Sequence, residues 1–311
     1  MAQVRERFQS LIAAFMTALL VCIAITGLSG GLTMAAEVNE DALRQAVTLY
    51  ASFDEAVKAD LGGGERTLRT RSNDRSKPGQ FVFEPGFDTK IFRIAKGKGI
   101  HGGALEVGDV LPNNGRIFFT ARGNIAYKKG GWGGTVSLWI NTDPTEMIKS
   151  RFCDPVQITQ KGANDGGIWV DFNEAQPRDM RMGIFPAVQA GQPAIKEDAP
   201  DAPLIRFPRV AFKSGEWHHL ALTWNNCDTG KANAQAAFYV DGLLVGELKD
   251  REIGMDWSIE QAGIYVAVNY IGLLDELALF NRSLTPMEVA RLHQRPRLLA
   301  GLASTAISGE K

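Results

Sequence analysis

Across residues 49–280, short runs of apolar residues alternate with polar ones and are separated by Gly and Pro. Alternation with a period of two indicates half-buried strands, and the Asp241-Gly242 pair between two such runs is a strong hairpin signal. The strand-helix alternation that builds parallel sheets is missing from the pattern. We therefore predict an all-β fold, a sandwich of two antiparallel sheets.

Residues 269–293 predict the last strand followed by a short C-terminal helix. Thr285 is the expected N-cap, and Glu288 completes a capping box in which each side chain bonds the other residue's backbone N–H. Pro286 suits the first helical position, where a backbone N–H would have no partner. These signals predict that the helix begins at Pro286.

The strand before that helix contains two adjacent carboxylates, Asp275 and Glu276. Simple alternation puts Leu273, Asp275 and Leu277 on one face, and it puts Leu274 and Glu276 on the other. Both faces are mostly apolar, which is typical of a central strand covered on both sides. A buried carboxylate needs a metal, an arginine or backbone N–H groups as its partner.

Five segments resemble, in the right order, motifs of the laminin-G-like, concanavalin A-like jelly-roll family. They are the Gly-rich stretch 99–105, GTVSLWI at 134–140, the Trp-His strand 217–224, FYVDG at 238–242, and the closing strand and helix at 272–285. The resemblance extends over residues 49–293 and implies a jelly-roll sandwich. It implies little about activity, because function belongs to sites and not to folds.

The first 36 residues have the layout of a secretory signal peptide. A basic start precedes an uncharged apolar run at 11–26, and small residues follow up to Ala36. We expect cleavage after Ala36 or Ala35, and hence a secreted, periplasmic or cell-surface protein. The alternative is an uncleaved membrane anchor, because residues 27–32 could extend the apolar run towards the ~20 residues that a span needs.

The predicted organisation is one domain with short flanking segments. Its parts are the signal peptide at 1–36, an N-terminal lead at 37–48, the sandwich at 49–293 and a C-terminal tail at 294–311. The 311 residues, 45% hydrophobic and 22% charged, have ordinary globular composition and suit one such sandwich. Because the net charge is only −1, we expect no nucleic-acid partner.

Three cysteines occur, and Cys22 belongs to the signal segment. Two remain, Cys153 and Cys227, and a pair of cysteines in an oxidising compartment predicts one disulfide. The alternative is two free, buried thiols.

The resemblance also implies a calcium site, because members of the family often bind calcium at the rim of the sandwich. Calcium prefers carboxylate and carbonyl oxygens. Asp54 and Asp60 follow the first predicted strand, and Asp275 and Glu276 lie on the last, which is commonly its neighbour in such jelly rolls. In the alternative interpretation these side chains cap turns or accept backbone N–H groups. Residues 164–167, NDGG, are a second possible ligand loop or a plain turn.

Exposed tryptophans are the candidate carbohydrate-binding residues, because the C–H faces of a sugar ring stack on aromatic rings. Trp132 lies in the Gly-rich segment KKGGWGG, which predicts a surface loop. Trp169 shares one strand face with Asp171, which could orient a sugar. Trp217, in contrast, belongs to a strand motif, and we expect it to pack in the core.

No catalytic pattern stands out. Retaining glycoside hydrolysis needs two carboxylates ~5–5.5 Å apart, which alternate positions of one strand can supply. The acids of the segment 171–174 face opposite sides of a strand, and so do Asp275 and Glu276 if alternation is regular. We therefore expect a protein without enzymatic activity, and a divergent glycoside hydrolase is the less favoured reading.

A basic segment at 66–77 contains four arginines and one lysine, with Glu65 and Asp74 nearby. We predict a loop here. It could contact an acidic polysaccharide or an anionic envelope surface, or it could simply be a solvated loop.

The sequence thus favours a non-catalytic secreted recognition module that binds carbohydrate or a glycan-bearing partner through rim loops. The alternative is a structural or assembly protein of the cell envelope that acts by protein–protein contact. A membrane contact is expected only if the N-terminal segment stays uncleaved.

Overall fold

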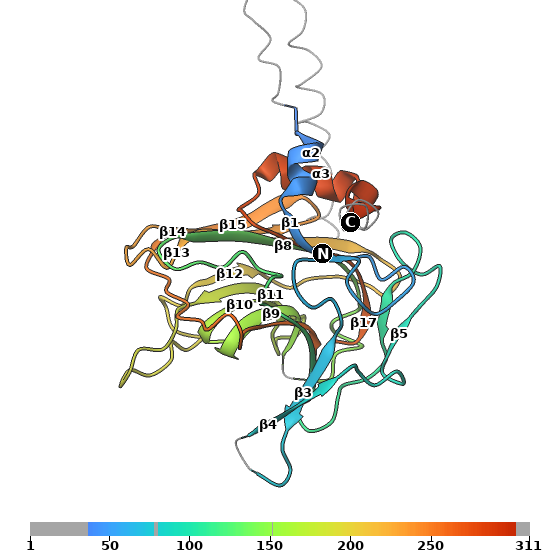
Figure 1. The fold of residues 1–311 in the computed structure, drawn as a ribbon, viewed down its shortest axis with the longest axis horizontal. Coiled ribbons are helices and arrows are strands. Elements are labelled where there is room, and N and C mark those ends of the chain that lie inside the picture. Colours follow the sequence, from blue (N-terminus) through green and yellow to red (C-terminus); the bar gives the residue numbers. More distant parts are fainter. Residues whose placement is uncertain (1–36, 78–79, 151, 303–311) are drawn as a thin grey trace, which may run out of the picture. The chain divides into compact units, whose positions relative to one another are not determined.

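In the computed structural model, residues 37–77, 80–150 and 152–302 are described, and they form a sandwich of two antiparallel sheets (Figure 1). The predicted fold class is thereby confirmed. The expected signal segment at 1–36 and residues 303–311 lie outside the described residues. Within the described residues, no helix is long and apolar enough to cross a membrane.

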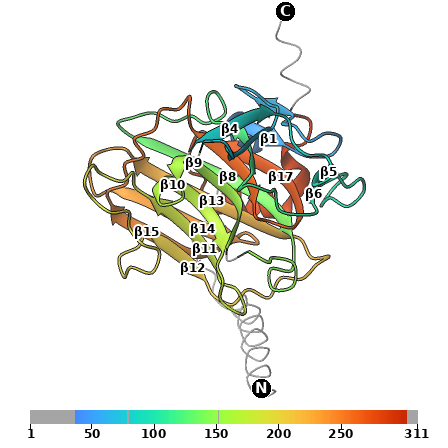
Figure 2. The ribbon, with the colours of Figure 1, turned by 90° about the horizontal axis from the view of Figure 1, so that it is seen from below.

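The first sheet has nine strands, and its main path runs in the order β15-β14-β13-β8-β17-β1-β2, with β6 paired to β17 and β5 paired to β6. Its strands are β1 Val47–Ala51, β2 Leu61–Gly62, β5 Phe92–Ile94, β6 Leu105–Val107, β8 Trp132–Asn141, β13 His218–Cys227, β14 Ala234–Val240, β15 Leu243–Arg251 and β17 Gly272–Phe280. Figure 2 shows β13, β14 and β15 on one side of β8, and β17, β5 and β6 on the other.

The second sheet has eight strands in the order β12-β11-β10-β9-β16-β7-β3-β4. They are β3 Arg69–Asn73, β4 Phe81–Pro85, β7 Arg116–Thr120, β9 Cys153–Gly162, β10 Asp165–Phe172, β11 Met180–Phe185, β12 Leu204–Phe207 and β16 Gly263–Val268. The basic segment predicted to be a loop contains β3, so that prediction is wrong for residues 69–73.

The main hydrophobic core lies between the two sheets. Alternate residues of each strand point into it, as Val136 and Leu138 do on β8 and as Ile168 and Val170 do on β10. The predicted alternation therefore identifies the core face of most strands.

The outer face of the nine-stranded sheet is covered by helices, α2 Glu40–Gln45 and α3 Pro286–Gln294, and by the 3-10 turn η1 Pro296–Leu299 (Figure 1). Leu43, Val289 and Leu298 pack with Tyr50 and Phe280 of the sheet in a second hydrophobic cluster. The packed part of the chain thus begins before residue 49 and continues past residue 293.

The C-terminal helix begins as predicted. Thr285 accepts a bond from the Glu288 backbone N–H, and the Glu288 side chain accepts one from the Thr285 N–H, so the capping box is complete. Arg282 also binds Glu288, at 2.8 and 2.6 Å, and fixes the chain at the helix start.

A β-bulge interrupts β17 between Asp275 and Ala278. Glu276 adopts a φ of +51°. Leu274 and Leu277, which flank the pair Asp275 and Glu276, both pack in the core between the sheets. The predicted regular alternation is therefore wrong here, because the extra residue of a bulge resets the pattern. Both carboxylates lie between two core positions.

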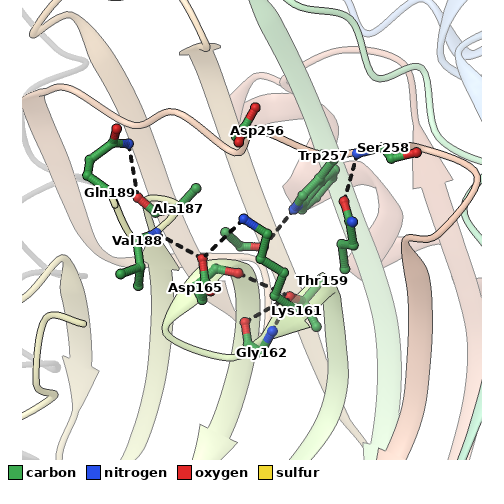
Figure 3. A network of polar contacts seen from close by, with 12 residues as sticks. Thr159, Lys161, Gly162, Asp165, Ala187, Val188, Gln189, Asp256, Trp257 and Ser258 are labelled. Carbon is green, nitrogen blue, oxygen red and sulfur yellow. Dashed lines mark hydrogen bonds and ion pairs between the residues drawn. The ribbon is translucent and has the colours of Figure 1, made fainter. Parts of the chain in front are cut away.

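The turn between β9 and β10 is held by a network of polar contacts (Figure 3). Asp165 accepts a bond from the Val188 N–H at 2.8 Å and lies 3.9 Å from the Lys161 ammonium. The indole of Trp257 donates to the Gly166 carbonyl at 2.7 Å. Asp165, the acidic residue of the second candidate ligand loop, is thus engaged in holding its own turn.

Candidate functional site

A pocket lies at the rim of the nine-stranded sheet, where β8 ends and β17 begins. Its volume is about 540 Å³, within the ~300–1,000 Å³ range of ligand pockets. It is lined by Lys98, Glu106, Val107, Gly108, Asn141, Met147, Ser214, Gly215, Trp217, Ile271, Gly272 and Leu273. We call this the rim pocket.

Trp217 is the aromatic residue of the rim pocket. It is half-buried, whereas the other five tryptophans of the chain are buried. It belongs to none of the hydrophobic clusters that the described residues form. The ring is therefore available to a ligand, and the expectation that Trp217 packs in the core is wrong.

Polar groups of the rim pocket come from three neighbouring segments. Asn141 accepts a bond from the Gly215 N–H at 2.8 Å, which ties the end of β8 to the loop that carries Trp217. Glu106 on β6 binds Arg93 at 2.7 Å, and this hydrogen bond holds the pKa of Glu106 below its usual range. Glu106 is thus an ionised, paired carboxylate.

Trp132 does not present a face to solvent, and that expectation is wrong. It is 2% exposed and starts β8. Its ring lies 5.1–5.3 Å from those of Tyr127, Trp224 and Trp257. The glycines around it allow the strand to approach its neighbours closely; at Gly134, an added methyl group would collide with the Trp224 ring.

Trp169 and Asp171 share the outer face of β10, as predicted, but both are buried. Trp169 stacks on Phe185 with ring centroids 5.6 Å apart, and its indole donates to the Ala163 carbonyl. Asp171 accepts two bonds from Arg181, one of them from Nε at 2.9 Å. The pocket beside them measures only about 90 Å³, which is too small for a sugar ring.

The four carboxylates of the expected calcium site come together where β1 ends beside β17. Asp54 accepts a bond from the Gly103 N–H at 3.0 Å and Asp60 one from the Ser52 N–H at 2.7 Å. Asp275 accepts from the Ile100 N–H at 2.8 Å, and Glu276 accepts from the Tyr50 hydroxyl at 2.7 Å.

Burial and neighbouring negative charge raise the pKa values of two of these carboxylates, Asp275 and Glu276. Burial and then the charge of Glu276 raise the pKa of Asp275 to about 9, and Asp54 adds to the effect. Burial also raises the pKa of Glu276 to about 7, with further contributions from Asp54 and Asp60. The ionised forms of Asp275 and Glu276 are therefore disfavoured in this position.

The donor chemistry around Asp275 fits calcium. A methyl group added to Gly99 would collide with the Asp275 carboxylate and with the carbonyl oxygens of His101 and Gly103, so these three oxygens converge on one small space. Calcium accepts such a mixture of carboxylate and carbonyl ligands. Among the described residues, no three His, Cys, Asp or Glu side chains are arranged to hold a metal ion, so backbone oxygens would have to supply part of the coordination.

Cys153 and Cys227 are free and buried, so the predicted disulfide is wrong. Cys227 pairs with Trp132 within the nine-stranded sheet, and Cys153 pairs with Phe172 within the eight-stranded sheet. Burial raises the pKa of the Cys227 thiol to about 12, which makes it unreactive at neutral pH.

A family model described as the concanavalin A-like lectin/glucanases superfamily, laminin G type, matches residues 119–290. The chain belongs to this family. The predicted resemblance is thereby confirmed, and the matched residues include the strands β8 and β17 that border the rim pocket. A comparison with curated protein sequences finds no match.

Similar solved structures include domains of larger proteins. Domain 4 of AbnA, a GH43 extracellular arabinanase from Geobacillus stearothermophilus, in complex with arabinotriose, is 17% identical, with 80% of this chain and 98% of that chain covered and a TM-score of 0.47. The receptor binding domain of botulinum neurotoxin D is 11% identical, with 82% and 54% covered and a TM-score of 0.50.

The binding domain of botulinum neurotoxin DC in complex with rat synaptotagmin II is also 11% identical, with 81% and 52% covered and a TM-score of 0.51. This laminin-G-type chain therefore spans about half the length of the neurotoxin domains. At such identities the likenesses show the fold alone.

Sequence reasoning missed the rim pocket of this family member because its residues come from distant segments, at 98–108, 141–147, 214–217 and 271–273. One local signal was present. Trp217 directly follows Ser214, Gly215 and Glu216, which are turn-forming or polar residues, so it stands at a strand entrance and not inside a strand.

Proposed function

We propose that this chain is a non-catalytic recognition module that binds carbohydrate, free or on a glycan-bearing partner, in the rim pocket. The observation that carries the proposal is Trp217, the half-buried tryptophan that lines the rim pocket of about 540 Å³. The C–H face of a sugar ring can stack on it, while Lys98, Asn141 and Ser214 supply hydrogen-bonding groups around the ring.

The charge of the rim pocket argues for binding without catalysis. Glycoside hydrolysis uses two carboxylic groups, one of them an acid with a raised pKa. Glu106 is the one carboxylate that lines the rim pocket, and its pKa is lowered by Arg93. Glu106 is therefore suited to accept hydrogen bonds from sugar hydroxyls and not to donate a proton.

A bound calcium ion beside Asp54 and Asp275 is part of the proposal. Asp275 lies two residues along β17 from Leu273 of the rim pocket, and Ile100, whose N–H binds Asp275, lies two residues from Lys98. Calcium there would neutralise the carboxylates and fix the loop that brings Lys98 to the sugar.

The test is a glycan and polysaccharide array probed with the purified protein in calcium and then in EDTA. We expect binding of a defined sugar that Trp217→Ala weakens by about tenfold or more, because stacking buries a large apolar face. Phe152→Ala is the matched control, since this ring is 47% exposed outside the rim pocket.

Absence of sugar binding by the folded protein would favour the second candidate, a protein–protein assembly role. The same fold occurs in the neurotoxin DC domain that is in complex with synaptotagmin II. Sugar release that is lost in Glu106→Gln would instead indicate a hydrolase.

A further inference from the structure

The eight-stranded sheet carries a group of polar residues on its outer face. The rim pocket lies at the other sheet, so the two sites are separate. Register places Arg71 of β3 opposite Arg116 of β7, and it places Gln157 of β9 opposite Tyr265 of β16. Arg116 donates to the side-chain amide oxygen Oε1 of Gln157 and Arg71 to the Tyr265 hydroxyl, both at 3.2 Å. Four neighbouring strands therefore contribute to one cluster.

Three buried donors of this cluster have no acceptor among the described residues. They are Nε of Arg71, Nε of Arg116 and Nε2 of Gln157. Gln157 is 1% exposed and Arg71 is 6% exposed. Buried donors without acceptors are rare and costly in native proteins, so the missing partner is an acceptor.

The cluster also lacks a counter-charge. Among the described residues, neither Arg71 nor Arg116 forms an ion pair, whereas Arg181 on the same face binds both Asp171 and Glu197. Burial and then the charge of Arg71 lower the pKa of Arg116.

Asp154 is the acidic residue whose charge acts on the pKa of Arg116. Burial and then the charge of Asp171 raise its pKa well above the ordinary value, so it is a poor counter-ion for Arg116. Two guanidinium groups thus stand side by side without a carboxylate bound to either.

Exposed aromatic rings border the cluster. The hairpin of β3 and β4 projects from the sandwich in Figure 1, and it carries Phe81 and Phe83, which are 45% and 51% exposed. The Arg71 guanidinium lies 4.1 Å from the centre of the Phe81 ring, and the Phe83 ring packs edge-on against Phe118 with centroids 6.1 Å apart. The exposed rings of Phe81 and Phe83 therefore lie directly beside the buried guanidinium of Arg71.

We propose that Arg71, Arg116 and Gln157 bind the acidic group of a charged saccharide, a carboxylate or a sulfate ester, while its ring lies against Phe81 and Phe83. Guanidinium groups bind planar anions with paired N–H donors, and the amide of Gln157 supplies one more donor. This acidic-saccharide site is separate from the rim pocket and does not depend on Trp217.

The test measures binding of polygalacturonate, dextran sulfate, neutral dextran and polyglutamate at one fixed ionic strength. We expect an acidic polysaccharide to bind, with neutral dextran and polyglutamate at least tenfold weaker, because a ligand needs both charge and a sugar ring. Preference for polygalacturonate or for dextran sulfate distinguishes a carboxylate from a sulfate ligand.

Two variants separate a binding site from a structural cluster. Arg116→Gln should weaken binding by about tenfold or more, as expected for lost charged hydrogen bonds, and Arg251→Gln on β15 makes the same change of net charge without effect. Gln157→Glu should also abolish binding, but it should raise the melting temperature because the new carboxylate pairs with Arg116.

Several results would overturn the proposal. They are equal binding of polyglutamate and acidic polysaccharide, binding of neither polysaccharide, equal binding by Arg116→Gln and Arg251→Gln, or Gln157→Glu protein that is folded and still binds. Trp217→Ala should leave this binding unchanged, so failure here and failure at the rim pocket are distinguishable.

Discussion

The two sheets of the sandwich share one core, but their outer faces differ in chemistry. The face of the nine-stranded sheet is covered by α2, α3 and η1, which bury Tyr50 and Phe280 in an apolar cluster. The face of the eight-stranded sheet carries a small apolar cluster of Phe118, Tyr265 and Val268 and the stacked pair Trp169 and Phe185, with buried arginines such as Arg71 and Arg181 among them. The first face is stabilised mainly by apolar burial under the helices, and the second carries a cluster of arginines and a glutamine.

The difference between the faces indicates which parts of this molecule can bind a ligand. Terminal helices cover one face with apolar side chains such as Leu43, Val289 and Leu298. The hairpin of β3 and β4 and the rim retain exposed or half-exposed rings with polar groups next to them, which is the combination that ligand sites need. Each of the following variants tests this division.

The largest effect is expected at the covered face. Phe280→Ala should lower the free energy of unfolding by about 3–5 kcal/mol, because it leaves a cavity under the helices. Phe83→Ala, on the open hairpin, should cost less than about 1 kcal/mol. Chemical denaturation of both variants gives the two values, and similar losses would refute the division of the faces.

The next effect is pH dependence at the acidic cluster. Asp275 and Glu276 have folded-state pKa values of about 9 and about 7, above the ~3.9 and ~4.3 of unfolded chains. At these two positions the folded state therefore binds more protons, and their contribution to stability is greatest below pH ~4. Stability should fall as pH rises through 7 and 9, by up to ~1.4 kcal/mol per pH unit for each group.

Asp275→Asn isolates this effect, since it keeps the shape of the side chain but removes its ionisation. Between pH 7 and 9 its unfolding free energy should change less than that of the parent protein. Exposed Asp198→Asn is the control and should keep the parent slope. Parallel curves for all three proteins would show that Asp275 is ionised normally.

The parts of the fold that depend on local signals could be predicted from the sequence. Alternation identified the strands, and Thr285 with Glu288 fixed the start of α3. The bulge at Glu276 could not be predicted, because the backbone strain of a positive φ is compensated by the Tyr50 hydrogen bond from a strand more than 200 residues away.

The exposure of the tryptophans was also beyond local reasoning. Trp132 lies among glycines, but Tyr127, Trp224 and Trp257 close over it. Trp217 lies beside a strand motif, but it belongs to none of the hydrophobic clusters of the described residues. Burial depends on which distant segments meet, and alternation carries no information about that.

A smaller effect is expected from calcium. At a concentration 100 times the Kd, a bound ion adds about 2.7 kcal/mol to stability. Gly99→Ala should abolish this gain, because the methyl group fills the space on which the three oxygens converge. Gly162→Ala, which has open space around it, is the matched control. Equal melting temperatures of the parent protein in calcium and in EDTA would argue against the ion.

The smallest change in stability is expected at the residue with the largest proposed role. Trp217→Ala should cost less than about 1 kcal/mol of unfolding free energy, because Trp217 lies outside the hydrophobic clusters of the described residues. Trp257→Ala should cost about 3–5 kcal/mol, because that ring is buried and its indole N–H binds the Gly166 carbonyl. Denaturation curves of both variants decide the matter. A large loss for Trp217→Ala would mean that the ring supports the fold, and any loss of sugar binding in that variant would then have to be attributed to unfolding of the rim.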